Sequence, residues 1–148
     1  AEKSKSNDNL VCSCLLHDYG HFILDDPDEL VKKNKDGKHE DIGYEYLKKF
    51  FKKEIVEPIK HHVKAKRYLA RDKKYYNRLS KASVVSLKLQ GGLLNSKEAK
   101  TFEKEEFFKE AIKLRKFDET AKKVGLKIKD IIDYKDLLKA SLKWITII

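Results

Sequence analysis

The apolar residues recur every three or four positions along most of the chain, which is the spacing that places them on one face of an α-helix. This pattern predicts helical segments at residues 9–22, 39–51, 56–71, 72–79, 81–90, 96–105, 107–123 and 134–148. Residues 24–38 are polar and predict a loop, and residues 127–132 (KIKDII) form the one ambiguous strand-like stretch. The pattern therefore favours an all-α fold, a bundle of about seven helices.

Residues with special backbone roles fall at the predicted breaks. Ser80 can cap the segment that follows it, and Gly91–Gly92 can end that segment. Either Asn95 or Ser96 can cap the next segment. Pro58 is tolerated if it lies in the first turn of a helix that begins near Val56.

The composition limits the class of protein. A chain of 148 residues predicts one domain, and its 41% of apolar residues can form one core. No apolar run approaches the roughly 18 residues that span a bilayer. The polar start AEKSKSNDN lacks the apolar stretch of a signal peptide, and two cysteines make no disulfide framework. We therefore expect a cytoplasmic protein that does not act at a membrane.

The net charge of +10 raises the question of nucleic-acid binding. The basic residues are almost all lysines, spread from Lys3 to Lys143 and interleaved with acidic residues. Nucleic-acid binders more often cluster their charge and favour arginine, which makes bidentate contacts. We therefore expect a solvated lysine-rich surface and no nucleic-acid partner, although the charge would attract a small anionic substrate.

The candidate chemistry begins with five histidines: His17, His21, His39, His61 and His62. His17 and Asp18 are adjacent at the end of an apolar segment, and His21 follows one helical turn later. Imidazole nitrogen and carboxylate oxygen suit Fe, Mn, Mg or Zn, and one carboxylate can bridge two ions. The alternative for the pair is a histidine satisfied within the core beside an exposed aspartate.

Further candidates lie on three other segments. His39 opens the second predicted helix. Only one of His61 and His62 can face the core, and periodicity leaves the choice open. Asp118 lies on an inward face, where a carboxylate needs a partner. Three histidines and two aspartates from separate helices are typical of a metal site inside a helical bundle.

The run LLHDYGH resembles the defining motif of the HD-domain superfamily, metal-dependent all-α proteins of which most are phosphohydrolases. The runs HVKAKRYL, SLKLQGG and LRKFD, in that order, resemble one branch of it, the phosphonate-degrading HD-domain oxygenases. These are mixed-valent diiron enzymes, similar in chemistry to myo-inositol oxygenase. The resemblance extends over roughly residues 9–138.

The resemblance implies roles for individual residues. Two iron ions, Fe(II) and Fe(III), would be held by five ligands, with the first aspartate as the bridge: His17, Asp18, His39, His62 and Asp118. It selects His62 over His61 because His62 matches the family's histidine before the Val-x-Ala-Lys run. The residues that would hold the substrate's phosphonate are His21, Lys66, Ser83 and Arg115, and those that would be catalytic are Asp18, His21 and Lys66.

The spacing agrees with these roles. Lys66 lies four residues after His62, and Arg115 three residues before Asp118, so each cation shares a helix face with a proposed ligand. Ser83 lies near a helix start, where the dipole favours anions. Alternatively, both cations belong to the lysine-rich surface. Gln90 belongs to the predicted helix stop and can also line the pocket as a substrate-binding residue.

The family supplies one more iron-binding histidine, from a helix before the stretch that aligns with Ala1. No residue here replaces it. We therefore expect residues 1–148 to form a single HD domain that lacks its N-terminal helix, with one iron ligand missing.

The leading hypothesis is a diiron oxygenase that uses dioxygen to cleave the carbon–phosphorus bond of a 1-hydroxyphosphonate. Its substrate would be a compound such as 2-amino-1-hydroxyethylphosphonate, with phosphate and glycine as products. The first alternative is a phosphohydrolase that uses Mn, Mg or Zn on a phosphate ester or nucleotide. The second is a non-enzymatic binding module. The sequence leaves the oligomeric state open.

Overall fold

A computed structural model of the chain describes residues 1–24, 36–122, 125 and 129–143. The described residues are mostly helical and form no β-strand beyond one isolated bridge between Phe51 and Leu142, which confirms the all-α prediction. The longer helices, in chain order, are α1 (Asp8–Leu16), α4 (His39–Leu47), α5 (Lys53–Leu69), α7 (Lys81–Leu89), α8 (Ser96–Phe102) and α9 (Phe108–Ala121). The shorter ones are α2 (Gly20–Ile23), α6 (Lys73–Tyr76) and α10 (Lys135–Ala140), with 3-10 turns at Glu2–Ser4 and Ile131–Tyr134.

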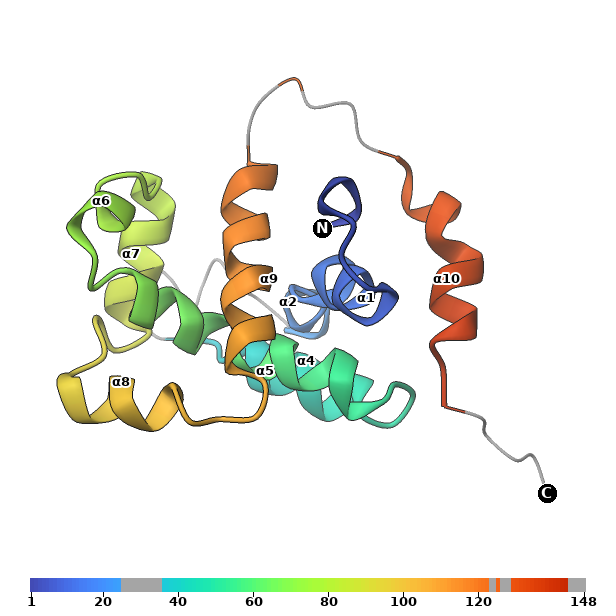
Figure 1. Ribbon diagram of the computed structural model, residues 1–148, viewed down its shortest axis with the longest axis horizontal. Helices are drawn as coiled ribbons and strands as arrows, with labels where there is room; N and C mark the ends of the chain where they lie inside the picture. The colour runs from blue at the N-terminus through green and yellow to red at the C-terminus, as the bar shows by residue number, and fades with distance from the viewer. Residues whose placement is uncertain (25–35, 123–124, 126–128, 144–148) are drawn as a thin grey trace.

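Helix α5 forms the centre of the described structure. It packs against α9, α4 and α1, and Figure 1 shows α9 crossing it, with α6–α8 on one side and α10 on the other. Ile55, Ile59 and Leu114 are fully buried where α5 meets its neighbours. Burial of each such side chain contributes about 1.5–3 kcal/mol, so this contact stabilises the helices that carry the polar residues described below.

The single helix predicted for residues 9–22 is wrong in its middle. Helix α1 ends at Leu16, and the backbone then tightens into i→i−3 hydrogen bonds, from the Tyr19 amide to the Leu16 carbonyl and from the His21 amide to the Asp18 carbonyl. The tighter turn brings the backbone of Gly20 against α4, where a Cβ atom would lie only 1.9 Å from the His39 carbonyl oxygen. The turn thus places Asp18 beside His39.

The start predicted for the third helix is also wrong. Helix α5 begins at Lys53, so Pro58 lies inside it and not in its first turn. The earlier start lets Ile55 and Val56 join the core, and this burial offsets the hydrogen bond that proline cannot donate.

Two predicted caps are confirmed. The Ser80 hydroxyl accepts from the Ser83 amide at the start of α7, and Asn95 forms a capping box with Glu98 at the start of α8. Helix α7 ends before Gly91 and Gly92, whose φ angles are +93° and +69°.

Parts of four other predictions lie outside the described residues. They are the loop at 24–38 except for residues 24 and 36–38, residue 123 at the end of the helix predicted for 107–123, residues 127–128 of the ambiguous stretch, and the end of the last helix beyond residue 143. Among the described helices, none combines the length and the apolar composition that a membrane span requires.

Substitution of Gly20 tests the close approach of α2 to α4. Gly20→Ala should lower the free energy of unfolding by about 1–3 kcal/mol, because the added methyl group overlaps a backbone carbonyl that cannot move away freely. Gly43→Ala is the matched control, since its Cβ would lie 3.1 Å from the nearest atom and should cost less. Urea unfolding measures both variants, and equal midpoints for them would contradict this account of the turn.

Candidate functional site

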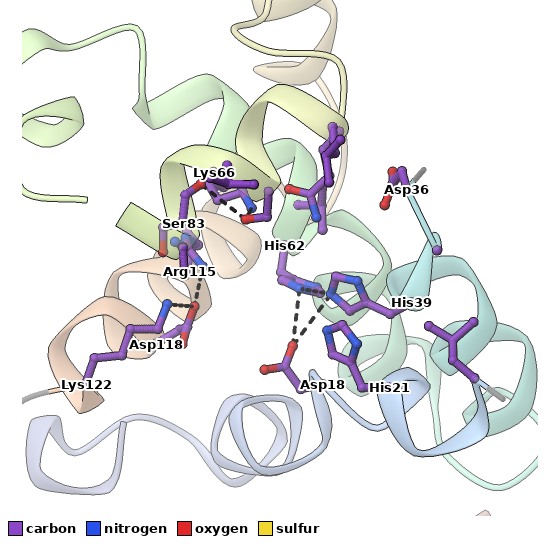
Figure 2. Close-up of a pocket in the computed structure, with 18 residues that line it drawn as sticks. Asp18, His21, Asp36, His39, His62, Lys66, Ser83, Arg115, Asp118 and Lys122 are labelled. Atoms are coloured by element: carbon purple, nitrogen blue, oxygen red, sulfur yellow. Dashed lines mark hydrogen bonds and ion pairs between the residues drawn. The ribbon is translucent and has the colours of Figure 1, made fainter. Parts of the chain in front are cut away.

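A pocket of about 670 Å³ lies where the α1–α2 turn meets α4, α5, α7 and α9. Its floor carries a cluster of imidazole and carboxylate groups, and one wall carries basic side chains, as Figure 2 shows. The wall residues comprise Lys66, Ser83, Arg115 and Lys122. The remaining lining is largely apolar, contributed by residues such as Val63, Val85 and Leu89.

The first part of the floor joins Asp18, His39 and His62. The Nε2 atoms of the two buried histidines lie 3.1 Å apart. Oxygen Oδ1 of Asp18 lies 3.6 Å from Nε2 of His39 and 3.8 Å from Nε2 of His62. The donor atoms of the three residues lie within 4.8 Å of one another, which is close enough for all three to bind one metal ion.

The second part of the floor joins Asp18, His17 and Asp118. The other oxygen of Asp18, Oδ2, lies 3.2 Å from Nε2 of His17. That nitrogen lies 3.7 Å from Oδ1 of Asp118. The carboxylate of Asp18 thus directs one oxygen to each part, which is the arrangement of a ligand that bridges two ions.

Backbone carbonyls fix the direction of two of the rings. Nδ1 of His62 donates to the Ile59 carbonyl oxygen at 2.6 Å, and Nδ1 of His17 donates to that of Cys14 at 2.9 Å. These bonds leave each Nε2 directed at the carboxylates, as second-shell hydrogen bonds do for ligating histidines. Nε2 of His17 is buried without a hydrogen-bond partner among the described residues, as expected for an atom that faces a metal.

Burial determines the protonation of the first pair of histidines. It lowers the pKa of His62 to about 3, with help from the nearby imidazoles of His17 and His39. It lowers the pKa of His39 to about 4, and His21 adds to this effect. Both rings are therefore neutral at pH 7, which is the form that binds a metal ion.

The second part of the floor favours positive charge. Burial lowers the pKa of His17, but the neighbouring carboxylates of Asp118 and Asp18 outweigh burial and raise this pKa to about 10. Burial raises the pKa of both aspartates, but His17 outweighs it, so the pKa of Asp18 falls well below its usual range and that of Asp118 falls to about 2. Two ionised carboxylates thus surround His17, and a metal cation would replace its proton.

Lys66 contributes a positive charge to the basic wall of the pocket. Its ammonium group donates to the Ser86 hydroxyl at 3.0 Å, and this hydroxyl donates to the Ser83 carbonyl oxygen. Burial, together with the charges of Arg115 and Lys122, lowers the pKa of Lys66 to about 8. An anion in the pocket would relieve this repulsion between like charges.

Arg115 is buried at the junction of the wall and the floor. Its Nε donates to the Tyr75 hydroxyl at 3.1 Å, and its terminal nitrogens donate to Asp118 and Glu119. Lys122 also contacts Asp118, at 3.3 Å from Oδ2. Oδ2 of Asp118 is therefore held by two cations, which leaves Oδ1 for the side of His17.

The structure brings together every site residue that the sequence singled out. His17 contacts Asp18 and Asp118 without lining the pocket itself, and the others line it: Asp18, His21, His39, His62, Lys66, Ser83, Gln90, Arg115 and Asp118. The ring of His21 stacks on that of His39, with centroids 4.0 Å apart. His61 points elsewhere, toward Glu57 and Glu105. Oε1 of Gln90 is buried without a partner among the described residues.

Sequence reasoning missed four residues that contact this set. Ser86 and Lys122 carry a usable signal, because they follow Ser83 and Asp118 by one helical turn. Glu119 follows Arg115 at the same spacing. Tyr75 carries no such signal, since it lies 40 residues from its partner Arg115.

The donor set fits a metal centre. It combines neutral imidazoles, ionised carboxylates and a buried His17 nitrogen that has no hydrogen-bond partner in the described part of the chain. Iron, manganese or zinc accept this mixture of nitrogen and oxygen. The two oxygens of Asp18 divide the donors into two groups, so the floor fits a pair of ions.

Comparison with known proteins finds one matching family model and several relatives. The family model described as HD domain matches residues 1–138. The chain is 40% identical over 145 residues to the hydroxymethylphosphonate dioxygenase of Gimesia maris, covering 97% of this chain and 72% of that protein. It is 39% identical over 131 residues to the glycine-betaine-forming 1-hydroxy-2-(trimethylamino)ethylphosphonate dioxygenase of Leisingera caerulea, covering 88% and 67% respectively.

A third relative is an uncharacterized protein of Acanthamoeba polyphaga mimivirus, 34% identical over 142 residues, with 93% of this chain and 64% of that protein covered. The two named relatives carry out the kind of reaction that the sequence motifs predicted, so the resemblance to the phosphonate-degrading branch is confirmed. With a family model that extends over most of its length, the chain belongs to the HD-domain family.

Proposed function

We propose that this chain is an HD-domain oxygenase that cleaves the carbon–phosphorus bond of a 1-hydroxyphosphonate. The observation that carries the proposal is the position of Asp18, whose two oxygens face two separate groups of ligands beneath a basic pocket. The names of two relatives, both hydroxyphosphonate dioxygenases, support the same reaction. The overall reaction consumes one dioxygen and releases one phosphate and one carboxylic acid, which is glycine if the substrate is 2-amino-1-hydroxyethylphosphonate.

Two iron ions, Fe(II) and Fe(III), are the proposed cofactor. His39 and His62 would hold one ion and His17 and Asp118 the other, with Asp18 between them. When bound, the iron pair supplies the redox chemistry that dioxygen needs, and the protein's contribution is ligation, orientation and exclusion of water. The apolar side chains around the pocket favour the last of these.

The basic wall would bind the phosphonate. Lys66 and Arg115 provide positive charge, and Ser83 lies in the first turn of α7, where the helix dipole also favours an anion. The amide oxygen of Gln90 has no partner among the described residues and can accept from a substrate hydroxyl. His21 stacks on His39 and lies beside Asp18, so its imidazole would face the substrate from the metal-binding side of the pocket. These contacts would direct the hydroxyl-bearing carbon toward the floor.

Reconstitution tests the reaction itself. Anaerobic addition of Fe(II) and then of 2-amino-1-hydroxyethylphosphonate and oxygen should give oxygen uptake with equal amounts of phosphate and glycine. Hydroxymethylphosphonate in place of this substrate checks whether the amine is needed. Absence of both iron uptake and oxygen use would contradict the proposal, and oxygen-independent release of phosphate from an ester would instead favour a hydrolase.

Substitution of Asp18 tests the bridge. Asp18→Asn removes the negative charge shared by both groups of ligands, so iron affinity and turnover should fall by at least about 100-fold, more than loss of an outer partner costs. His61→Gln is the matched control, because His61 contacts Glu57 and Glu105 away from the floor. Iron per chain and oxygen uptake are the readouts. Normal iron content in Asp18→Asn would show that this carboxylate is not a ligand.

The lowered pKa of Lys66 predicts a pH dependence. Only the ammonium form attracts the phosphonate, so kcat/KM should fall as the pH rises through about 8, where Lys66 loses its proton. Lys66→Arg keeps the charge at higher pH and should shift the fall upward. Steady-state rates measured from about two pH units below to about two pH units above the Lys66 pKa of about 8 test this. A profile identical in both proteins would exclude Lys66 as the titrating group.

A further inference from the structure

The guanidinium of Arg115 is held by side chains from two different helices. Asp118 and Glu119 accept from its terminal nitrogens, and both lie on α9 with Arg115 itself. The Tyr75 hydroxyl accepts from Nε at 3.1 Å and comes from α6, 40 residues away in the chain. Among the hydrogen bonds and ion pairs of the Arg115 side chain with described residues, the bond to Tyr75 is therefore the one that does not move with α9.

Tyr75 is itself rigidly placed. Its side chain is 8% exposed and packs with Ala70 and Leu87 in a small apolar cluster between α5, α6 and α7. The Asp72 side chain caps α6 by accepting from the Tyr75 amide at 2.8 Å, so the backbone at this position is also fixed. A tyrosine held in this way can define the position of the group that donates to it.

The contacts of Arg115 determine what the guanidinium can still do. An arginine side chain has five N–H donors. Three nitrogens each donate to one partner, to Tyr75, Asp118 and Glu119, and the guanidinium also lines the pocket. The remaining N–H groups lie in the same plane, so the bond from Nε to Tyr75 also fixes their direction.

The same contact reaches the floor of the site. Asp118 turns Oδ2 toward Arg115 and Oδ1 toward His17. A rotation of the guanidinium would rotate this carboxylate with it. The hydroxyl of Tyr75 thus lies at the start of a chain of contacts that ends at a proposed iron ligand.

We propose that Tyr75 is a positioning residue of this site: through Arg115, its hydroxyl sets the direction of the phosphonate-binding N–H groups and of the Asp118 carboxylate. The inference rests on the proposed function for its link to phosphonate binding. Without the hydroxyl, the buried Nε–H of Arg115 has no acceptor, and the side chain turns to find another.

Tyr75→Phe tests the proposal, because it removes the hydroxyl and keeps the buried ring. The KM for the hydroxyphosphonate should rise about tenfold with a smaller change in kcat, as loss of one hydrogen bond to a charged group predicts. Tyr76→Phe is the matched control, since this neighbouring tyrosine packs in the same cluster but does not contact Arg115. Thermal unfolding checks that both variants are folded.

A double substitution separates positioning from a merely structural role. Lysine cannot make the three bonds of Arg115, so in an Arg115→Lys background Tyr75→Phe should change KM by less than about twofold. An unchanged KM in Tyr75→Phe, or the same tenfold rise in both backgrounds, would overturn the proposal.

Binding of inorganic phosphate, measured by calorimetry on the same iron-loaded variants, keeps the two proposals apart. If phosphate binds the parent chain tightly and Tyr75→Phe weakens it about tenfold, the positioning role is supported even if no hydroxyphosphonate is turned over. In that case the proposed function alone fails. If phosphate binds both equally, the role of Tyr75 is wrong whatever the turnover.

Discussion

The structure depends on two carboxylates that lie against a cluster of imidazoles, one of them on the largely buried Asp118 and the other on the half-exposed Asp18. Asp18 and Asp118 flank His17, and Asp18 also faces His39 and His62. An ionised carboxylate as buried as that of Asp118 is costly unless a cation compensates it, and Asp18 adds a second negative charge beside the same histidine. In the metal-free protein the proton on His17 and the basic groups of Arg115 and Lys122 provide this charge. A metal pair would provide more of it, so metal binding and the stability of this region are linked.

The packing of the helices brings these groups together. Helix α5 supplies His62 and Lys66 from one face and packs its apolar face against α1, α4 and α9. The tight turn after α1 and the bare backbone of Gly20 bring Asp18 to His39. Helix α7 contributes Ser83 to the basic wall of the pocket, where the phosphonate would bind, and Tyr75 of α6 holds Arg115 in that wall. The pocket therefore has a metal-binding floor and an anion-binding wall held by different packing contacts.

Local signals predicted much of the fold. Apolar spacing located the helices, and Ser80, Asn95 and the glycine pair marked their ends, because caps depend on neighbouring residues alone. The break after Leu16 and the early start of α5 were missed, since both follow from packing against distant helices. The choice between His61 and His62 needed the family motif, because apolar periodicity left open which of the two faces the core. The link from Tyr75 to Arg115 spans 40 residues and left no pattern in the sequence.

The central claim is that Asp18 lies between two metal ions. Anomalous scattering at the iron edge, from crystals of the iron-reconstituted protein, tests it most directly. The account predicts two peaks, one beside His39 and His62 and one beside His17 and Asp118, with the Asp18 carboxylate contacting both. A single peak that Asp18 does not contact, or peaks remote from these residues, would contradict it.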